Sequence, residues 1–235
     1  MPSNPTLIRS ALAACAFAAV TYSASAEVLY SQNFNEPNAT TPLSSFSWTV
    51  FRGGSTQPSI NSSGTTTGDI FNTERAAFLN INTTNASGWF AGLSYAYTGA
   101  LPTTNRSLLS LSANVYAGGS VGSRGDVTLR IESSAGNWIG WTIPGTTLTS
   151  SNGIVAGGLL SSTTHSAGTF NASASSFNII LAFANTGTWG NDASNVIGID
   201  NVTFQTVTPV PEPASAAALA GALVLGAVAT RRRRR

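Results

Sequence analysis

The sequence predicts an all-β protein, an antiparallel sandwich of two sheets in a jelly-roll arrangement. Several stretches alternate apolar and polar residues with a period of two, the pattern of strands with one buried face. Turn signals rich in glycine, proline and asparagine separate these stretches at short intervals. No window of residues 27–208 shows the 3.6-residue apolar period of an amphipathic helix. About nine or ten short strands in one domain favour a jelly roll over a right-handed parallel β-helix, which would need a fixed repeat period.

Strands are expected along the whole body of the chain. The clearest alternations cover residues 106–116, 126–132 and 177–183. In the second of these, the charged residues Arg130 and Glu132 share one parity and are expected to face outward, away from the apolar residues between them. Further candidate strands are 28–34, 46–51, 76–81, 89–97, 138–143 and 196–205.

The final predicted strand contains an irregularity. Ile197 and Ile199 have one parity, whereas Val202 and Phe204 have the other. All four side chains can reach the core only if the strand shifts by one residue at positions 200–201. The sequence therefore predicts a β-bulge at this point.

The first 26 residues are predicted to be a secretory signal peptide. Arg9 gives a positive start, residues 11–20 form a short apolar segment, and Ala24 and Ala26 fit an A-x-A cleavage site before Glu27. We therefore expect export through the secretion translocon and removal of this segment.

The carboxyl-terminal segment, 209–235, has three parts: a proline-rich motif (210–213), an uncharged apolar run (214–230) and a basic end (231–235). As a helix, the run would extend roughly 25 Å, enough to cross a thin bilayer. A short core helix is the alternative, but the run lacks the polar face expected of one. The arginines would stop translocation and stay cytoplasmic. The motif residues are Val210, Pro211, Glu212 and Pro213, and the stop-transfer residues are Arg231, Arg232, Arg233, Arg234 and Arg235.

This order of parts resembles the PEP-CTERM sorting signal of Gram-negative bacteria, with Pro211, Glu212 and Pro213 matching its motif. The resemblance implies that an exosortase, a membrane protease-transpeptidase, cleaves near the motif. The chain would then pass through the inner membrane transiently and reach the cell surface or extracellular matrix. The exported part would be a single domain, 27–208.

The composition of this body excludes several classes of function. Residues 27–208 hold five arginines, no lysine and eight carboxylates, a net charge of −3, so no nucleic-acid partner is expected. The single cysteine, Cys15, lies in the predicted signal peptide, which leaves the body without disulfides or thiol chemistry. CxxC, HExxH and phosphate-loop motifs are also absent from the sequence.

Two short segments at the ends of the body, 29–34 and 199–202, resemble the edges of jelly-roll carbohydrate-binding modules. In that family such edges often hold a structural calcium, and the resemblance implies Asn33 and Asp200 as its ligands. Gln32 stands where the family more often has glutamate, which removes a carboxylate that calcium prefers. The alternative is that Asp200 and Asn33 satisfy backbone donors at the bulge. No other cofactor is expected.

Aromatic residues are the candidate ligand contacts. Tryptophans in or beside predicted strands can stack on sugar faces, although most tryptophans pack in a core. Trp138 and Trp141 are three residues apart and should face opposite sides of a strand, so one of them is expected to point outward. The candidates for glycan stacking are Trp89, Trp138, Trp141 and Trp189.

Signals for catalysis are weak. The single histidine, His165, stands in a stretch rich in serine, threonine and glycine, which predicts a solvated loop. The sequence shows no carboxylate pair with the spacing that glycoside hydrolysis needs. We therefore expect a non-enzymatic surface or matrix protein, structural or binding an exopolysaccharide. A secreted polysaccharide hydrolase is the alternative.

Overall fold

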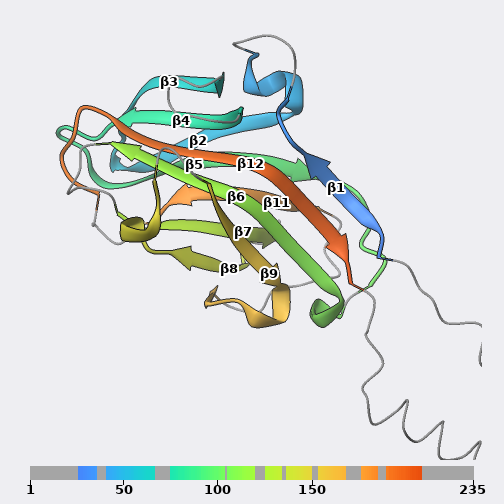
Figure 1. Cartoon of the computed structure of the whole chain (residues 1–235). Helices are drawn as coiled ribbons and strands as arrows, with labels where there is room; N and C mark the ends of the chain where they lie inside the picture. The colour runs from blue at the N-terminus through green and yellow to red at the C-terminus, as the bar shows by residue number, and fades with distance from the viewer. Residues whose placement is uncertain are drawn as a thin grey trace, which may run out of the picture. The chain divides into compact units, whose positions relative to one another are not determined.

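A computed structural model describes residues 26–35, 41–66, 75–103, 105–119, 125–133, 136–149, 153–167, 176–184 and 189–207. Within these ranges the chain forms two six-stranded antiparallel sheets that pack face to face, without any α-helix (Figure 1). This confirms the predicted all-β sandwich. Residues Ala26–Val207 form one compact unit. In the described ranges no helix is long and apolar enough to cross a bilayer, and the tail, 209–235, lies outside them.

The first sheet, called sheet I, is built around the last strand of the body. Its order is β3–β4–β12–β6–β9, and β1 also pairs with β12. The strands are β1 (Val28–Gln32), β3 (Ser59–Thr66), β4 (Ala76–Asn82), β6 (Leu109–Gly119), β9 (Ile154–Leu159) and β12 (Asn195–Thr206).

The second sheet, called sheet II, has the order β10–β8–β7–β11–β5–β2. The strands are β2 (Trp48–Thr56), β5 (Ser87–Tyr97), β7 (Val127–Ser133), β8 (Trp138–Ile143), β10 (His165–Ala167) and β11 (Phe177–Phe183). Four short 3-10 turns connect strands among the described residues: η1 (Leu43–Phe46), η2 (Arg106–Leu108), η3 (Gly145–Thr147) and η4 (Leu160–Ser162).

Three strands lack the pattern that predicted the others. Strand β3 is almost uniformly polar, so it shows no alternation. Strand β9 contains Gly157 and Gly158 at φ values of 104° and 144°, backbone conformations that favour glycine. Strand β10 has three residues, too few to show a period. The predicted loop position of His165 is wrong, because this residue begins β10 and pairs with Gly140.

The inner faces of the two sheets form one hydrophobic core. In β7, Leu129 and Ile131 are buried in it, whereas Arg130 and Glu132 point to the opposite side and keep side-chain exposures of 20% and 24%. The outward prediction for the two charged residues is therefore confirmed. Full burial of an aliphatic side chain contributes about 1.5–3 kcal/mol. Because residues 27–208 contain no cysteine, this core carries the stability that disulfides supply in other exported domains.

The predicted bulge in β12 is confirmed. Its register with β6 shifts between Asp200 and Thr203. Asn201 has a φ of 49°, in the left-handed region that asparagine tolerates. The shift turns side chains of both parities into the core, and the four buried ones are Ile197, Ile199, Val202 and Phe204. Strand β12 pairs with β4 before the bulge and with β1 after it, so the bulge marks the place where the neighbouring strand changes.

Candidate functional site

A groove of about 620 Å³ lies on the outer face of sheet II. Its lining comes from β2, β5, β7, β8, β11 and the residue that follows β11. Strand alternation explains most of the lining, because the residues between the lining positions face the core; Phe183, a core residue that also reaches the groove, is the exception. We call this surface the outer groove, and it is lined by Thr49, Phe51, Phe90, Ser94, Thr128, Arg130, Glu132, Trp138, Thr142, Asn178, Ile180, Ala182, Phe183 and Ala184.

Strand register lines these side chains up across the sheet. Thr49 pairs with Ser94, Ser94 with Ile180, and Ile180 with Arg130. From β2 to β8 the groove crosses four strand-to-strand steps, a width of roughly 19 Å at the usual spacing between strands. The outer groove is therefore a partly open groove that runs across the strands, with room for an extended ligand.

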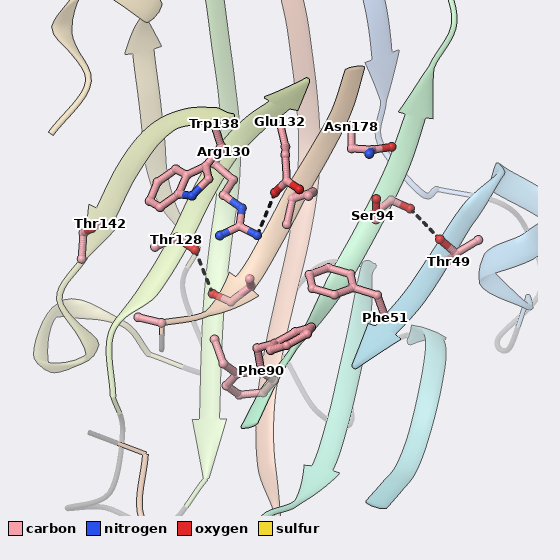
Figure 2. Close-up of a pocket in the computed structure, with 14 residues that line it drawn as sticks. Thr49, Phe51, Phe90, Ser94, Thr128, Arg130, Glu132, Trp138, Thr142 and Asn178 are labelled. Carbon is pink, nitrogen blue, oxygen red and sulfur yellow. Dashed lines mark hydrogen bonds and ion pairs between the residues drawn. The ribbon is translucent and has the colours of Figure 1, made fainter. Parts of the chain in front are cut away.

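Two phenylalanines form the apolar end of the outer groove. Phe51 on β2 pairs with Gly92 on β5, and Phe90 on β5 pairs with Gly53 on β2. A Cβ atom at either glycine would collide with the ring of the paired phenylalanine. Each ring therefore lies across the strand opposite, over a position that has no side chain. The ring centroids are 6.4 Å apart and Phe90 is 43% exposed, so Phe90 offers a broad apolar surface to the groove (Figure 2).

Three side chains form the other end of the outer groove. Nη2 of Arg130 lies 3.0 Å from Oε2 of Glu132. The Arg130 guanidinium carbon lies 4.8 Å from the centroid of the Trp138 ring, a cation–π contact. Burial lowers the pKa of the Arg130 guanidinium, while the ion pair and hydrogen bond with Glu132 oppose this shift. The guanidinium stays charged, because arginine does not lose its proton in proteins.

Polar side chains also line the outer groove, on the strands of its two ends and on β11 between them (Figure 2). The Thr49 hydroxyl donates to the backbone carbonyl of Ser94 at 3.3 Å. Asn178 projects from β11 near Glu132 and carries both donor and acceptor atoms. This part of the groove can exchange hydrogen bonds with a hydroxyl-rich ligand, while the aromatic rings at the ends contact its apolar faces.

The structure places the four predicted tryptophans in different environments. Trp138 lines the outer groove and Trp141 faces the core, so the prediction that they face opposite sides is confirmed. Trp141 is 7% exposed and Trp189 is 6% exposed, which leaves neither ring a face for a sugar. Trp89 is partly buried against the core, with its ring centroid 5.6 Å from that of Phe183. Packing in or against the core thus accounts for three of the four tryptophans, Trp89, Trp141 and Trp189.

Sequence reasoning missed Phe51 and Phe90. The sequence does contain a signal, since each phenylalanine stands two residues before a glycine that shares its face of the strand: Gly53 after Phe51, and Gly92 after Phe90. The signal becomes meaningful only once the two Phe-x-Gly segments are known to pair with each other. The sequence placed Arg130 and Glu132 on the outer face of a strand, but it did not join them with Trp138 into a site.

The two predicted calcium ligands belong to sheet I: Asn33 directly follows its first strand, β1, and Asp200 lies in its last strand, β12. Asp200 is buried, and its Oδ2 accepts a hydrogen bond from Nδ2 of Asn201 at 2.9 Å. Asn33 is exposed, and its Oδ1 accepts from the backbone N–H of Asn35 at 3.4 Å. Among the described residues, no three His, Cys, Asp or Glu side chains gather where they could hold a metal. One carboxylate and one amide fall short of the six to eight oxygens that calcium takes, so calcium binding stays a prediction.

No protein-family model matches the chain, and no curated protein matches its sequence. Solved structures do match its fold. One, from a study of the promiscuous specificity of carbohydrate-binding modules of the β-sandwich superfamily, has a TM-score of 0.50 and 10% identity over 74% of this chain and 60% of that chain. The family 11 carbohydrate-binding module of the cellulosomal cellulase Lic26A-Cel5E of Clostridium thermocellum has a TM-score of 0.46 and 14% identity, covering 82% and 99%. An exo-β-agarase has a TM-score of 0.47 and 14% identity, covering 78% and 26%.

The described body thus has the jelly-roll sandwich fold found in carbohydrate-binding modules. At such low identities the likeness concerns the fold alone.

The aromatic end of the outer groove gives a first test. Gly53→Ala should lower the free energy of unfolding by about 1–3 kcal/mol, because the new methyl group forces the Phe90 ring aside. In a Phe90→Ala background the same substitution should cost much less, since the three atoms nearest to that methyl all belong to the ring. Chemical denaturation measures both. Gly64→Ala is the matched control, because its methyl meets its nearest neighbours at 3.7 Å. An equal cost with and without the ring would contradict this packing.

Calcium gives a second test. If Asn33 and Asp200 hold a structural calcium, the melting temperature of the purified body should be higher in calcium than in a chelator. An unchanged melting temperature would contradict the predicted site. A clear rise with millimolar calcium would show that further oxygens complete a site there.

Proposed function

We propose that this protein is an exported surface or extracellular-matrix protein that binds an exopolysaccharide in the outer groove and does no catalysis. The observation that carries the proposal is the composition of the groove, with aromatic rings at both ends and polar side chains beside and between them. Sugar rings have apolar C–H faces and polar edges. A site for a glycan therefore needs flat aromatic surfaces together with hydrogen-bonding groups.

The shape of the outer groove supports a polymer as the ligand. The groove is partly open to solvent and crosses five neighbouring strands. A closed pocket would suit a small sugar, whereas this open surface suits an internal stretch of a chain. The fold is consistent with the proposal, because a carbohydrate-binding module of the β-sandwich superfamily shares it.

Hydrolysis is the alternative function, and the groove supports it less well. Glycoside hydrolysis usually needs two carboxylates facing each other across the scissile bond. Among the lining residues of the outer groove, Glu132 is the only carboxylate, and it is held in an ion pair with Arg130. This arrangement suits binding better than acid–base catalysis.

The sorting route belongs to the same proposal. We expect the secretion translocon to export the chain and an exosortase to process it near Pro211–Glu212–Pro213. Mass spectrometry of the protein recovered outside the cells tests this directly. The expected masses begin at Glu27 and end near the motif. Recovery of a chain that retains residues 214–235 would contradict processing.

Glycan binding is tested by substitutions at the two ends of the groove. Trp138→Ala and Phe90→Ala should each weaken polysaccharide affinity about tenfold or more, close to 1.4 kcal/mol, because each removes one apolar stacking surface. Affinity electrophoresis against a panel of soluble polysaccharides measures the effect. Val155→Ala is the control, since Val155 is 76% exposed on β9 of sheet I.

Two outcomes would contradict the proposal. One is a wild-type protein that binds no polysaccharide of the panel. The other is release of new reducing ends from a bound polysaccharide, abolished by Glu132→Gln, which would favour the hydrolase.

A further inference from the structure

We infer that Glu132 is a specificity-determining residue that reserves the outer groove for uncharged polysaccharides and keeps acidic polysaccharides out. The inference rests on the proposed function, because it concerns which class of glycan the same groove accepts. It comes from the way in which the charges of the groove are arranged.

The outer groove contains one cation and one anion, and they neutralise each other. Among its lining residues the charged ones are Arg130 and Glu132. They occupy outward positions two residues apart on β7, and their side chains meet at 3.0 Å. An approaching glycan therefore meets a surface without net charge.

The position of the Arg130 guanidinium is fixed in a way that would allow it to bind an anion. The Trp138 ring lies 4.8 Å from it, and Glu132 holds Nη2. Its Nε–H is buried and makes no hydrogen bond to any described residue. A partly desolvated guanidinium in a fixed position is a strong ligand for a carboxylate. Without Glu132, the groove would offer such a cation to the carboxylate of a uronic acid.

Glu132 prevents this in two ways. Its carboxylate already occupies the guanidinium and belongs to the same strand, so a carboxylate from solution would have to displace a tethered competitor. A glycan carboxylate that approached Arg130 would also meet the negative charge of Glu132. Neutral hydroxyl groups experience no such repulsion and can accept from or donate to the pair as it stands.

The test compares neutral and acidic polymers. The probes are mixed-linkage β-glucan, xylan and galactomannan as neutral polymers, and polygalacturonate, alginate and hyaluronan as acidic ones. We expect the wild type to bind at least one neutral polymer more tightly than every acidic one, with an affinity that changes little with salt. Glu132→Gln should gain about tenfold or more in affinity for an acidic polymer, and about 0.5 M salt should remove that gain.

Two further variants separate specificity from net charge and from folding. Glu27→Gln removes one negative charge at an exposed position outside the outer groove, and it should gain no acidic binding. The double variant Arg130→Gln with Glu132→Gln should lose the gain, because the exposed cation is gone. Melting temperatures of all variants show whether each one is folded.

The outcomes separate the two levels of the proposal. Failure of the wild type to bind any of the six polymers would overturn the proposed function and this inference together. Neutral binding with an unchanged acidic affinity in a folded Glu132→Gln variant would overturn the inference alone. Wild-type binding of an acidic polymer as tight as that of any neutral polymer would also overturn it.

Discussion

Contact between the inner faces of the two sheets is the constraint on which the rest of this structure depends. The body has no cysteine to form a disulfide, so the strands must bury a large apolar core between the two sheets. The bulge in β12 shows how strict this requirement is. The strand changes its neighbour from β4 to β1, and the register shift keeps Val202 and Phe204 buried after the change.

The outer groove is a consequence of the same alternation. In β7 and β8, residues that face the core alternate with residues on the outer face. In β8, Trp141 therefore packs in the core, whereas Trp138 lines the outer groove. The two Phe-x-Gly segments use the pairing of β2 with β5, because each glycine leaves room for the ring of the opposite strand. The core and the outer groove thus occupy opposite faces of sheet II.

Local sequence patterns predicted much of the fold and part of the site. Alternation located most strands, the bulge at Asp200, and the outward side of Arg130. It could not locate Phe51 in a site, because the role of this residue depends on pairing with a strand some forty residues away. Such register is set by the whole sheet. The burial of Trp189 could not be predicted either, because it depends on a tertiary contact of this loop residue with Phe183, whose ring centroid lies 4.7 Å away.

The proposed function requires the outer face of sheet II to bind a neutral polysaccharide. The most direct measurement is an NMR titration of the isotopically labelled body with a soluble oligosaccharide from the polymer that it binds best. Binding in the outer groove should change the chemical shifts of residues at the outward positions of β2, β5, β7, β8 and β11, including the indole N–H of Trp138. Changes confined to sheet I, with the outer groove unaffected, would contradict binding in the groove.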